Sequence, residues 1–270
     1  MKKILLLAAT AMLLIAHACQ KENASAGIHS HEIAEMKQYL ADTYGFASES
    51  IEEEHDHFVV EGDQRFDMRH FWENFAYATD NEFMVDAAQQ NEVATDRRHY
   101  RWSYLVTNSN NVLVTVLPNV PQVWRTAITK AVSDWNALNG RLKFSIQYRT
   151  TIQNGTVNIS MNTTYLDPID YAIADYPTSN GYPGREIHIN PAYNSEAALN
   201  ANGKVGVIAH EIGHTLGIRH TDSGQGSLIT NVSSTCRNNT DPYSVMSAQG
   251  SFYYGFTVCD KEAYKALYPK

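Results

Sequence analysis

Cysteine is scarce in this 270-residue sequence, which contains three of them. None belongs to a Cys-x-x-Cys pair, so a cysteine-based metal or redox site is disfavoured. No cysteine lies between residues 20 and 235, which excludes a cysteine switch that blocks a metal site. Cys19 lies near the N-terminus, and we expect the remaining two, Cys236 and Cys259, to form a disulfide in an exported chain. Such a bridge would stabilise the fold by roughly 3 kcal/mol in the chain-entropy description.

The chain also has few positively charged residues and no long apolar run. The 21 Lys and Arg residues are outnumbered by 29 Asp and Glu residues, which gives a formal net charge of −8. This balance argues against nucleic acid as a partner. No apolar run reaches the roughly 20 residues that a membrane-spanning helix needs. The chain is nevertheless 43% hydrophobic, which is enough to fill a core.

The first 18 residues have the organisation of a secretory signal peptide. Lys2 and Lys3 are followed by an apolar run over residues 4–15 and then by small residues. The position of Cys19 resembles that in bacterial lipoprotein signals and implies a lipidated first residue of the mature chain, although Ala16 stands where leucine is usual. We therefore expect an exported bacterial protein, a lipoprotein of the outer membrane or cell surface, that meets the membrane only through Cys19. Cleavage and secretion without lipid is the alternative.

Residues 210–220 carry the most specific pattern, which reads His-Glu-Ile-Gly-His-Thr-Leu-Gly-Ile-Arg-His. On a helix that advances about 100° per residue, His210 and His214 point the same way and can reach one ion. Glu211 lies on the adjoining face, where a general base would act without binding the metal. Gly217 can adopt positive φ and end the helix, so that His220 turns back toward the metal. Three ligands leave a fourth position open, as in catalytic zinc sites.

The motif resembles the signature of the metzincin metallopeptidases, in which a methionine-containing turn follows the third histidine. Residues 241–247 match that turn, with Met246 as its methionine. Within the metzincins, the Ile-Gly pair of the motif, Val59–Asp63 and the region from Tyr264 to Tyr268 are similar to the bacterial dual-action HEIGH metallopeptidases. Ala248 stands where astacins carry a tyrosine, so a tyrosine ligand or oxyanion stabiliser is not expected there.

The resemblance implies an α+β fold: a metzincin-type zincin catalytic domain with a mixed twisted sheet, packed helices, a zinc helix and a methionine turn. It also implies one zinc ion bound by His210, His214 and His220, with Met246 beneath the imidazoles as a non-ligand. Residues 185–190 resemble the edge strand along which metzincins bind extended peptides.

Apolar periodicity divides the chain after residue 18 into three segments. Residues 19–29 are small and polar and form a tether. Residues 30–95, which begin with the helical pattern of Ile33, Met36 and Leu40, form an N-terminal accessory or pro-like region. Its role as latency segment, exosite or packing element stays open. Residues 96–270 form the catalytic domain, with strand patterns at 112–116, 142–148 and 157–161 and a helical pattern from Trp124 to Leu138.

Several other polar residues have two interpretations. Asp63 invites comparison with the aspartate that blocks zinc in some astacin precursors, but we favour an ordinary Gly-Asp turn at a strand end. We expect His188 to be a cleft wall or a solvated residue rather than a fourth ligand. His55 and His57, in a charge-rich stretch, are expected to be solvated. Three tyrosines near the methionine turn are expected to be packing residues: Tyr243, Tyr253 and Tyr254.

These observations predict an exported zinc endopeptidase that acts on peptides or proteins, with Glu211 as general base. The alternative is a non-catalytic surface-binding lipoprotein that keeps the zinc fold. Intact Glu211 weighs against that alternative, because a purely structural site has no use for a base. Zinc-dependent deacylation of a non-peptide substrate is a third possibility that the motif alone leaves open.

Overall fold

The computed structural model describes residues 30–44, 46–68, 71–72, 98–163, 166, 168–224, 226–248 and 253–270. The predicted signal peptide, the tether, Cys19 and the domain boundary near residue 95 lie outside them. The helices are α1 (Ser30–Tyr44), η1 (Ser48–Ser50), α3 (Gln122–Ala137), η3 (Pro191–Tyr193), α4 (Ala201–Thr215), α5 (Ser234–Asn238) and α6 (Val258–Leu267). The strands are β1 (Ile51–Glu54), β2 (His57–Val60), β3 (Gln64–Asp67), β4 (Tyr100–Arg101), β5 (Asn111–Val116), β6 (Lys143–Tyr148), β7 (Val157–Met161), β8 (Ala172–Asp175), β9 (Glu186–Ile189) and β10 (Ser227–Leu228).

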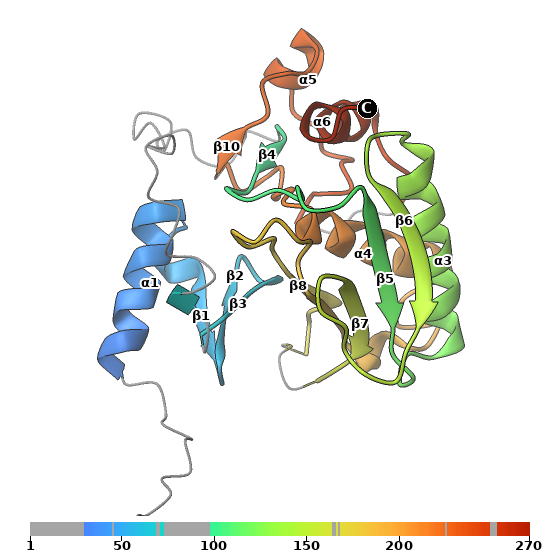
Figure 1. Cartoon of the computed structure of the whole chain (residues 1–270), viewed down its shortest axis with the longest axis horizontal. Helices are drawn as coiled ribbons and strands as arrows, with labels where there is room; N and C mark the ends of the chain where they lie inside the picture. Colours follow the sequence, from blue (N-terminus) through green and yellow to red (C-terminus); the bar gives the residue numbers. More distant parts are fainter. Residues whose placement is uncertain are drawn as a thin grey trace, which may run out of the picture.

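Eight of these strands form one mixed sheet in the order β1-β2-β3-β8-β9-β7-β5-β6 (Figure 1). Strands β6, β5, β7 and β9 run parallel to one another, and β8 is antiparallel to β9. Strands β1 to β3 form an antiparallel meander that joins the rest through a parallel β3–β8 pair. The mixed sheet with packed helices that the sequence predicts is therefore present.

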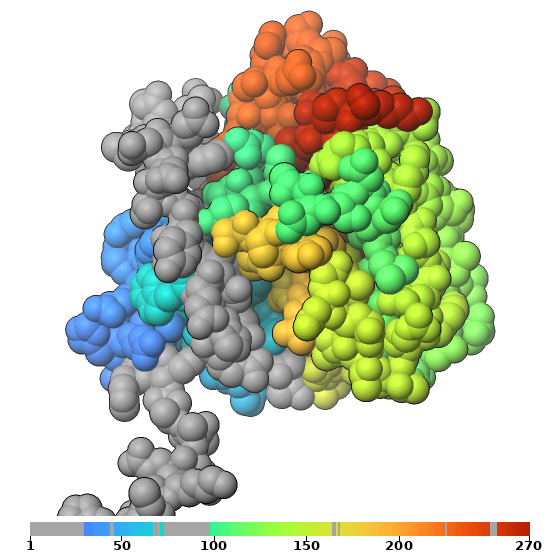
Figure 2. Space-filling model, viewed as in Figure 1, coloured from blue at the N-terminus to red at the C-terminus, as the bar shows by residue number. Residues whose placement is uncertain are grey.

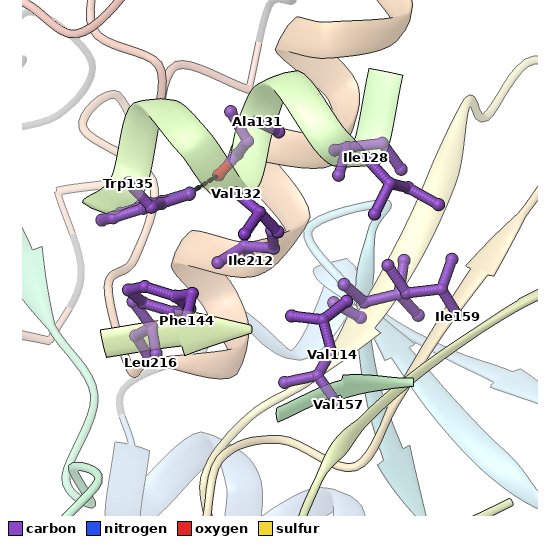
Figure 3. Packing of buried hydrophobic residues seen from close by; sticks show 14 of the residues in the cluster. Val114, Ile128, Ala131, Val132, Trp135, Phe144, Val157, Ile159, Ile212 and Leu216 are labelled. Atoms are coloured by element: carbon purple, nitrogen blue, oxygen red, sulfur yellow. Dashed lines mark hydrogen bonds between the residues drawn. The ribbon is translucent and has the colours of Figure 1, made fainter. Parts of the chain in front are cut away.

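The main core lies between the sheet and the helix pair α3 and α4 (Figure 3). The buried face of α3 carries Trp124, Ile128 and Trp135, at the helical spacing read from the sequence. Trp135 also donates a hydrogen bond from Nε1 to the carbonyl oxygen of Ala209 on α4 at 3.1 Å. Helix α4 buries its predicted apolar stripe in the same core. Among the described helices, none is long and apolar enough to cross a bilayer.

The N-terminal elements have a second core that reaches into the catalytic part of the chain. Helix α1 and strands β1 to β3 enclose a cluster that includes Leu40, Phe58 and Phe66. Trp102 and Tyr176, which come from beyond residue 95, belong to the same cluster and stack at a centroid distance of 4.6 Å. In Figure 2 these elements, in blue and cyan, cover one flank of the molecule. The predicted accessory region thus continues the catalytic sheet and shares its packing.

The prediction that residues 185–190 form an edge strand is wrong. Strand β9 lies between β7 and β8, and the antiparallel strand β8 lies outside it. The resemblance to metzincins implied an exposed edge, but the polar side chains of β9 are paired inside the protein. Glu186 Oε2 lies 3.5 Å from Nη1 of Arg65 and 3.1 Å from Nε2 of His188.

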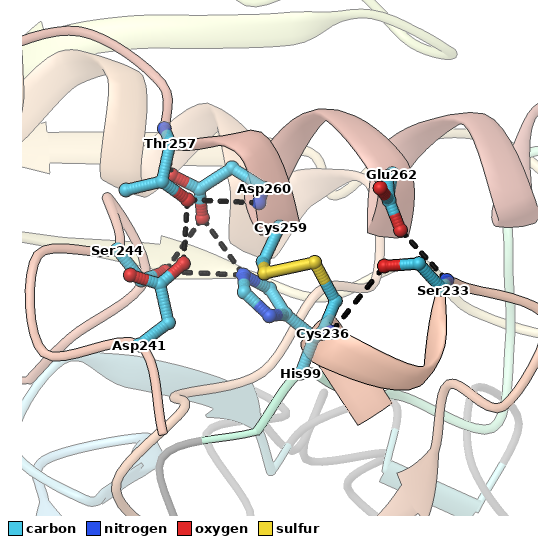
Figure 4. Close-up of a disulfide and its surroundings, with 9 residues drawn as sticks. All are labelled: His99, Ser233, Cys236, Asp241, Ser244, Thr257, Cys259, Asp260 and Glu262. Carbon is cyan, nitrogen blue, oxygen red and sulfur yellow. Dashed lines mark hydrogen bonds and ion pairs between the residues drawn. A yellow bond between two sulfur atoms is a disulfide. The ribbon is translucent and has the colours of Figure 1, made fainter. Parts of the chain in front are cut away.

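The disulfide Cys236–Cys259 is present as predicted, and it ties α5 to α6 (Figure 4). Beside it, Asp260 caps α6 by accepting a hydrogen bond from the backbone N–H of Thr257 at 2.8 Å. The same carboxylate accepts hydrogen bonds from Ser244 Oγ at 2.6 Å and from the N–H of Val245 at 3.1 Å. Nε2 of His99 lies 2.8 Å from it. This network fixes the turn that contains Met246.

Candidate metal centre

Three imidazoles converge at the end of α4. The Nε2 atom of His214 lies 3.0 Å from that of His210 and 3.1 Å from that of His220, and the third separation is 3.1 Å. His210 and His214 come from successive turns of the helix, as the sequence predicts. Gly217 has φ +86°, and a Cβ there would lie 2.6 Å from the carbonyl oxygen of Tyr104. Only glycine therefore allows the turn that returns His220 to the site.

Contacts at Nδ1 orient the Nε2 lone pairs of His210 and His214 toward the middle of the histidine cluster. Nδ1 of His210 lies 2.7 Å from the carbonyl oxygen of Val245, and Nδ1 of His214 lies 2.9 Å from that of Ile218. A carbonyl oxygen can only accept, so each Nδ1 carries a proton and each neutral ring presents an Nε2 lone pair. Ligand atoms around one tetrahedral zinc ion stand roughly 3.3 Å apart, given bonds of about 2.0–2.1 Å. The three nitrogens therefore fit a zinc ion.

Glu211 lies beside the histidines and is 3% exposed. Its Oε2 atom is buried without a hydrogen-bond partner among the described residues, although the side chain lines a cleft. Burial, reinforced by the charge of Asp63, raises the pKa of Glu211 well above its usual range. Its place in the lining puts the carboxyl group within reach of a molecule bound in the cleft.

Met246 is buried and packs against α4 between the two helical histidines. Its Sδ atom lies so close to Gly213 that a Cβ at that position would clash with it. The carbonyl oxygen of Met246 accepts a hydrogen bond from the N–H of Thr221 at 2.9 Å, next to His220 in the chain. The turn predicted from residues 241–247 thus contacts the histidine motif from below α4.

Asp63 is the main correction to the sequence analysis. It does lie in a turn, between β2 and β3, but the interpretation of Asp63 as a turn residue alone is wrong. Its Oδ2 atom lies 2.8 Å from Nε2 of His220, 3.0 Å from that of His210 and 3.6 Å from that of His214. Burial opposes ionisation, but His220 and His214 outweigh it and hold the pKa of Asp63 well below its usual range. The four side chains form one potential metal-binding group.

Three residues around His220 were given no role from the sequence: Glu61, Gln64 and Arg219. Glu61 Oε2 lies 3.4 Å from Nδ1 of His220 and accepts a hydrogen bond from Nε2 of Gln64 at 2.7 Å. Burial opposes the charge on Glu61, but Arg219 and the His220 contact lower its pKa to about 2. The sequence offered two signals. Glu61 and Asp63 flank a glycine directly after an apolar strand, and Arg219 is a charged residue inside the histidine motif.

The other histidines that the structure describes do not reach the site. His188 is not part of the cluster, as expected, but it is 4% exposed rather than solvated, and Nη1 of Arg65 lies 3.0 Å from its Nε2 atom. His57 is fully buried, so its predicted exposure is wrong, whereas His55 is exposed as predicted. The sequence predicts a short strand around Phe58 to Val60, but its charge-rich flank did not show that His57 begins this strand, β2, whose four residues are all buried.

A cavity of about 370 Å³ opens beside His210 and Glu211. Asp63 and β8 form part of its wall, and α4 and the segment after Met246 form another part. Tyr253 is a packing residue, as predicted, and its hydroxyl donates to Asp134 at 2.9 Å. The packing prediction is wrong for Tyr243 and Tyr254, which are 68% and 81% exposed, and all three tyrosines line the cavity.

An open cleft therefore lies beside three convergent imidazoles that could hold a metal ion and beside the buried carboxyl group of Glu211. Comparison with protein families identifies the chain more closely: the model of the dual-action HEIGH metallopeptidases matches residues 78–239, more than half of the sequence. The chain belongs to that family, as its motif predicted. Comparison with curated proteins finds no match. Membership makes the protein a metallopeptidase, for which a metal, typically zinc, and a peptide or protein substrate are implied.

Proposed function

We propose that this protein is an exported zinc endopeptidase in which His210, His214 and His220 bind the metal. The observation that carries the proposal is the convergence of three Nε2 atoms within 3.1 Å of one another. The position of His210 and Glu211 in the wall of a cleft supports turnover rather than a structural metal. The methionine turn beneath α4 supports the metzincin type of zincin domain.

Bound zinc would lower the pKa of a water molecule to about 7 and polarise the scissile carbonyl. Glu211 would take a proton from the attacking water and deliver it to the leaving amine. Burial raises the pKa of Glu211, which favours its holding the proton between the attacking water and the leaving amine. No covalent intermediate with the enzyme is needed.

We also propose that the site is latent while Asp63 contacts the three histidines. Asp63 occupies the open side of the three histidines. Strand β3 pairs with the outer edge of β8 through Gln64 and Arg65, and the N–H of Ala174 donates to the carbonyl oxygen of Asp63 at 2.9 Å. An extended peptide substrate that adds to β8 by backbone hydrogen bonds would need the same edge. Activity therefore requires Asp63 and β3 to leave.

Single replacement of each ligand tests the metal site. His210→Ala, His214→Ala and His220→Ala should each lose stoichiometric zinc, because one third of the protein ligands is removed. Zinc content after gel filtration is the measurement, and His31→Ala, on the exposed face of α1, is the control. Full zinc occupancy and activity in His220→Ala would show that the three-histidine site is wrong.

Export and lipidation at Cys19 are part of the proposal and rest on the sequence of residues 1–19. The mature chain from the native bacterial host should carry an acyl mass on Cys19 and partition with membranes, whereas Cys19→Ser should not. Intact mass spectrometry of the two chains is the measurement. A water-soluble mature chain that begins at an unmodified Cys19 would contradict the lipid anchor.

A further inference from the structure

We propose that Glu61 is a positioning residue that orients His220 for metal binding, so that the N-terminal region is part of the metal centre as well as a cover over it. This inference rests on the proposed function, because it assigns an orienting partner to one of the proposed ligands. Metal-binding histidines donate their second ring N–H to a carboxylate or carbonyl, which fixes the ring and its tautomer.

The three histidines differ in where that second partner comes from. His210 and His214 use the backbone carbonyls of Val245 and Ile218, both within the catalytic part of the chain. The Nδ1 atom of His220 instead faces two side chains of the N-terminal region, Glu61 through Oε2 at 3.4 Å and Gln64 through Nε2 at 3.4 Å. The orientation of the third ligand thus depends on the turn between β2 and β3.

Arg219 holds Glu61 in place. Its Nη2 atom lies 3.3 Å from Glu61 Oε1, and its guanidinium lies 4.3 Å above the ring of Phe46. Arg219 is 1% exposed, and a buried guanidinium requires a nearby anion. Both oxygens of Glu61 are therefore engaged, one by Arg219 and the other by Gln64 and His220.

The turn between β2 and β3 places Glu61 and Asp63 at the two ring nitrogens of His220. Glu61 has φ +55°, which is unfavourable for a residue with a side chain, and Gly62 follows with φ +85°. This turn brings Glu61 to Nδ1 of His220 and Asp63 to its Nε2. Glycine at position 62 accommodates this second positive φ without strain.

Zinc affinity of the full mature chain, measured by competition with a chromophoric chelator, tests this assignment. Glu61→Gln should lower the affinity roughly 10- to 100-fold, the usual effect of losing an orienting partner. Glu52→Gln, an exposed change of the same charge on β1, should have no effect. Equal affinity in these two variants would overturn the proposal. Normal zinc binding by His220→Ala would instead show that the metal site itself is wrong.

A double variant distinguishes the positioning of His220 by Glu61 from simple neutralisation of the Arg219 charge. In Glu61→Gln/Arg219→Met both buried charges of the Glu61–Arg219 ion pair are removed together, so the free energy of unfolding should recover while zinc affinity stays low. Recovery of both would make Glu61 a structural counter-ion only and would overturn the proposal. Should Glu61→Gln fail to fold, Glu61→Asp keeps the charge near Arg219 but draws the carboxylate back from His220. It should fold and bind zinc more weakly, and unchanged affinity would again contradict the role.

Discussion

Glu211→Ala should leave zinc bound and lower peptide hydrolysis by at least roughly 10²- to 10⁴-fold. General acid–base catalysis accelerates a reaction by about this factor, and activation of the attacking water depends on the same carboxylate. The fold should tolerate the change, because Oε2 of Glu211 is buried without a hydrogen-bond partner among the described residues. Hydrolysis of a casein-like substrate by wild-type and variant chains of equal zinc content is the measurement.

The exposed variant Glu52→Ala serves as the control for that comparison and should match the wild type. Equal hydrolysis by Glu211→Ala would point to a contaminating protease or to a different base. Absence of hydrolysis in both chains, across a broad set of substrates, would favour the alternative of a zinc-fold binding lipoprotein. Retained binding of an inert peptide by Glu211→Ala would be consistent with the enzyme.

Asp63→Ala should have the opposite effect and raise the activity of the full mature chain. A hydrogen bond to a charged group is worth about 1.5–3 kcal/mol, so its loss should increase the open population roughly 10- to 100-fold. The measurement is kcat/KM for a peptide substrate, with zinc content measured on the same samples. Unchanged or lower activity at equal zinc content would refute the latent arrangement.

Removal of residues 30–95 is a weaker test of latency than this single substitution. It deletes Asp63, but it also deletes Glu61 and the apolar partners of Trp102 and Tyr176. A shortened chain is therefore expected to be less stable and to bind zinc less well, which would mask any gain from uncovering the site. Asp63→Ala leaves those contacts intact.

Features encoded by local periodicity could be predicted from the sequence. Helices α1 and α3 and strands β5 to β7 follow apolar spacing, because a buried face repeats every 3.6 or every two residues. The arrangement of His210, Glu211 and His214 follows from one turn of helix, and the return of His220 follows from a single glycine with positive φ.

Features that depend on long-range pairing could not be predicted in this way. Asp63 reaches the histidines only because β3 pairs with β8, and no local signal connects residue 63 with residue 210. The edge strand was misassigned because a short resemblance does not determine strand order, and β8 pairs with β9 on the side that was expected to be open. His57 was predicted to be solvated because a charge-rich sequence does not reveal which side chains the β1–β3 meander buries.

The central claim is zinc-dependent peptide hydrolysis at the site of His210, His214 and His220, and mass spectrometry of cleavage products tests it most directly. Zinc-loaded Asp63→Ala chain is incubated with a peptide library before and after removal of the metal with a chelator. Internal cleavage products should appear with the zinc-loaded chain, disappear on chelation and return when zinc is restored. Products that persist without metal, or their absence from the fully zinc-loaded chain, would contradict it.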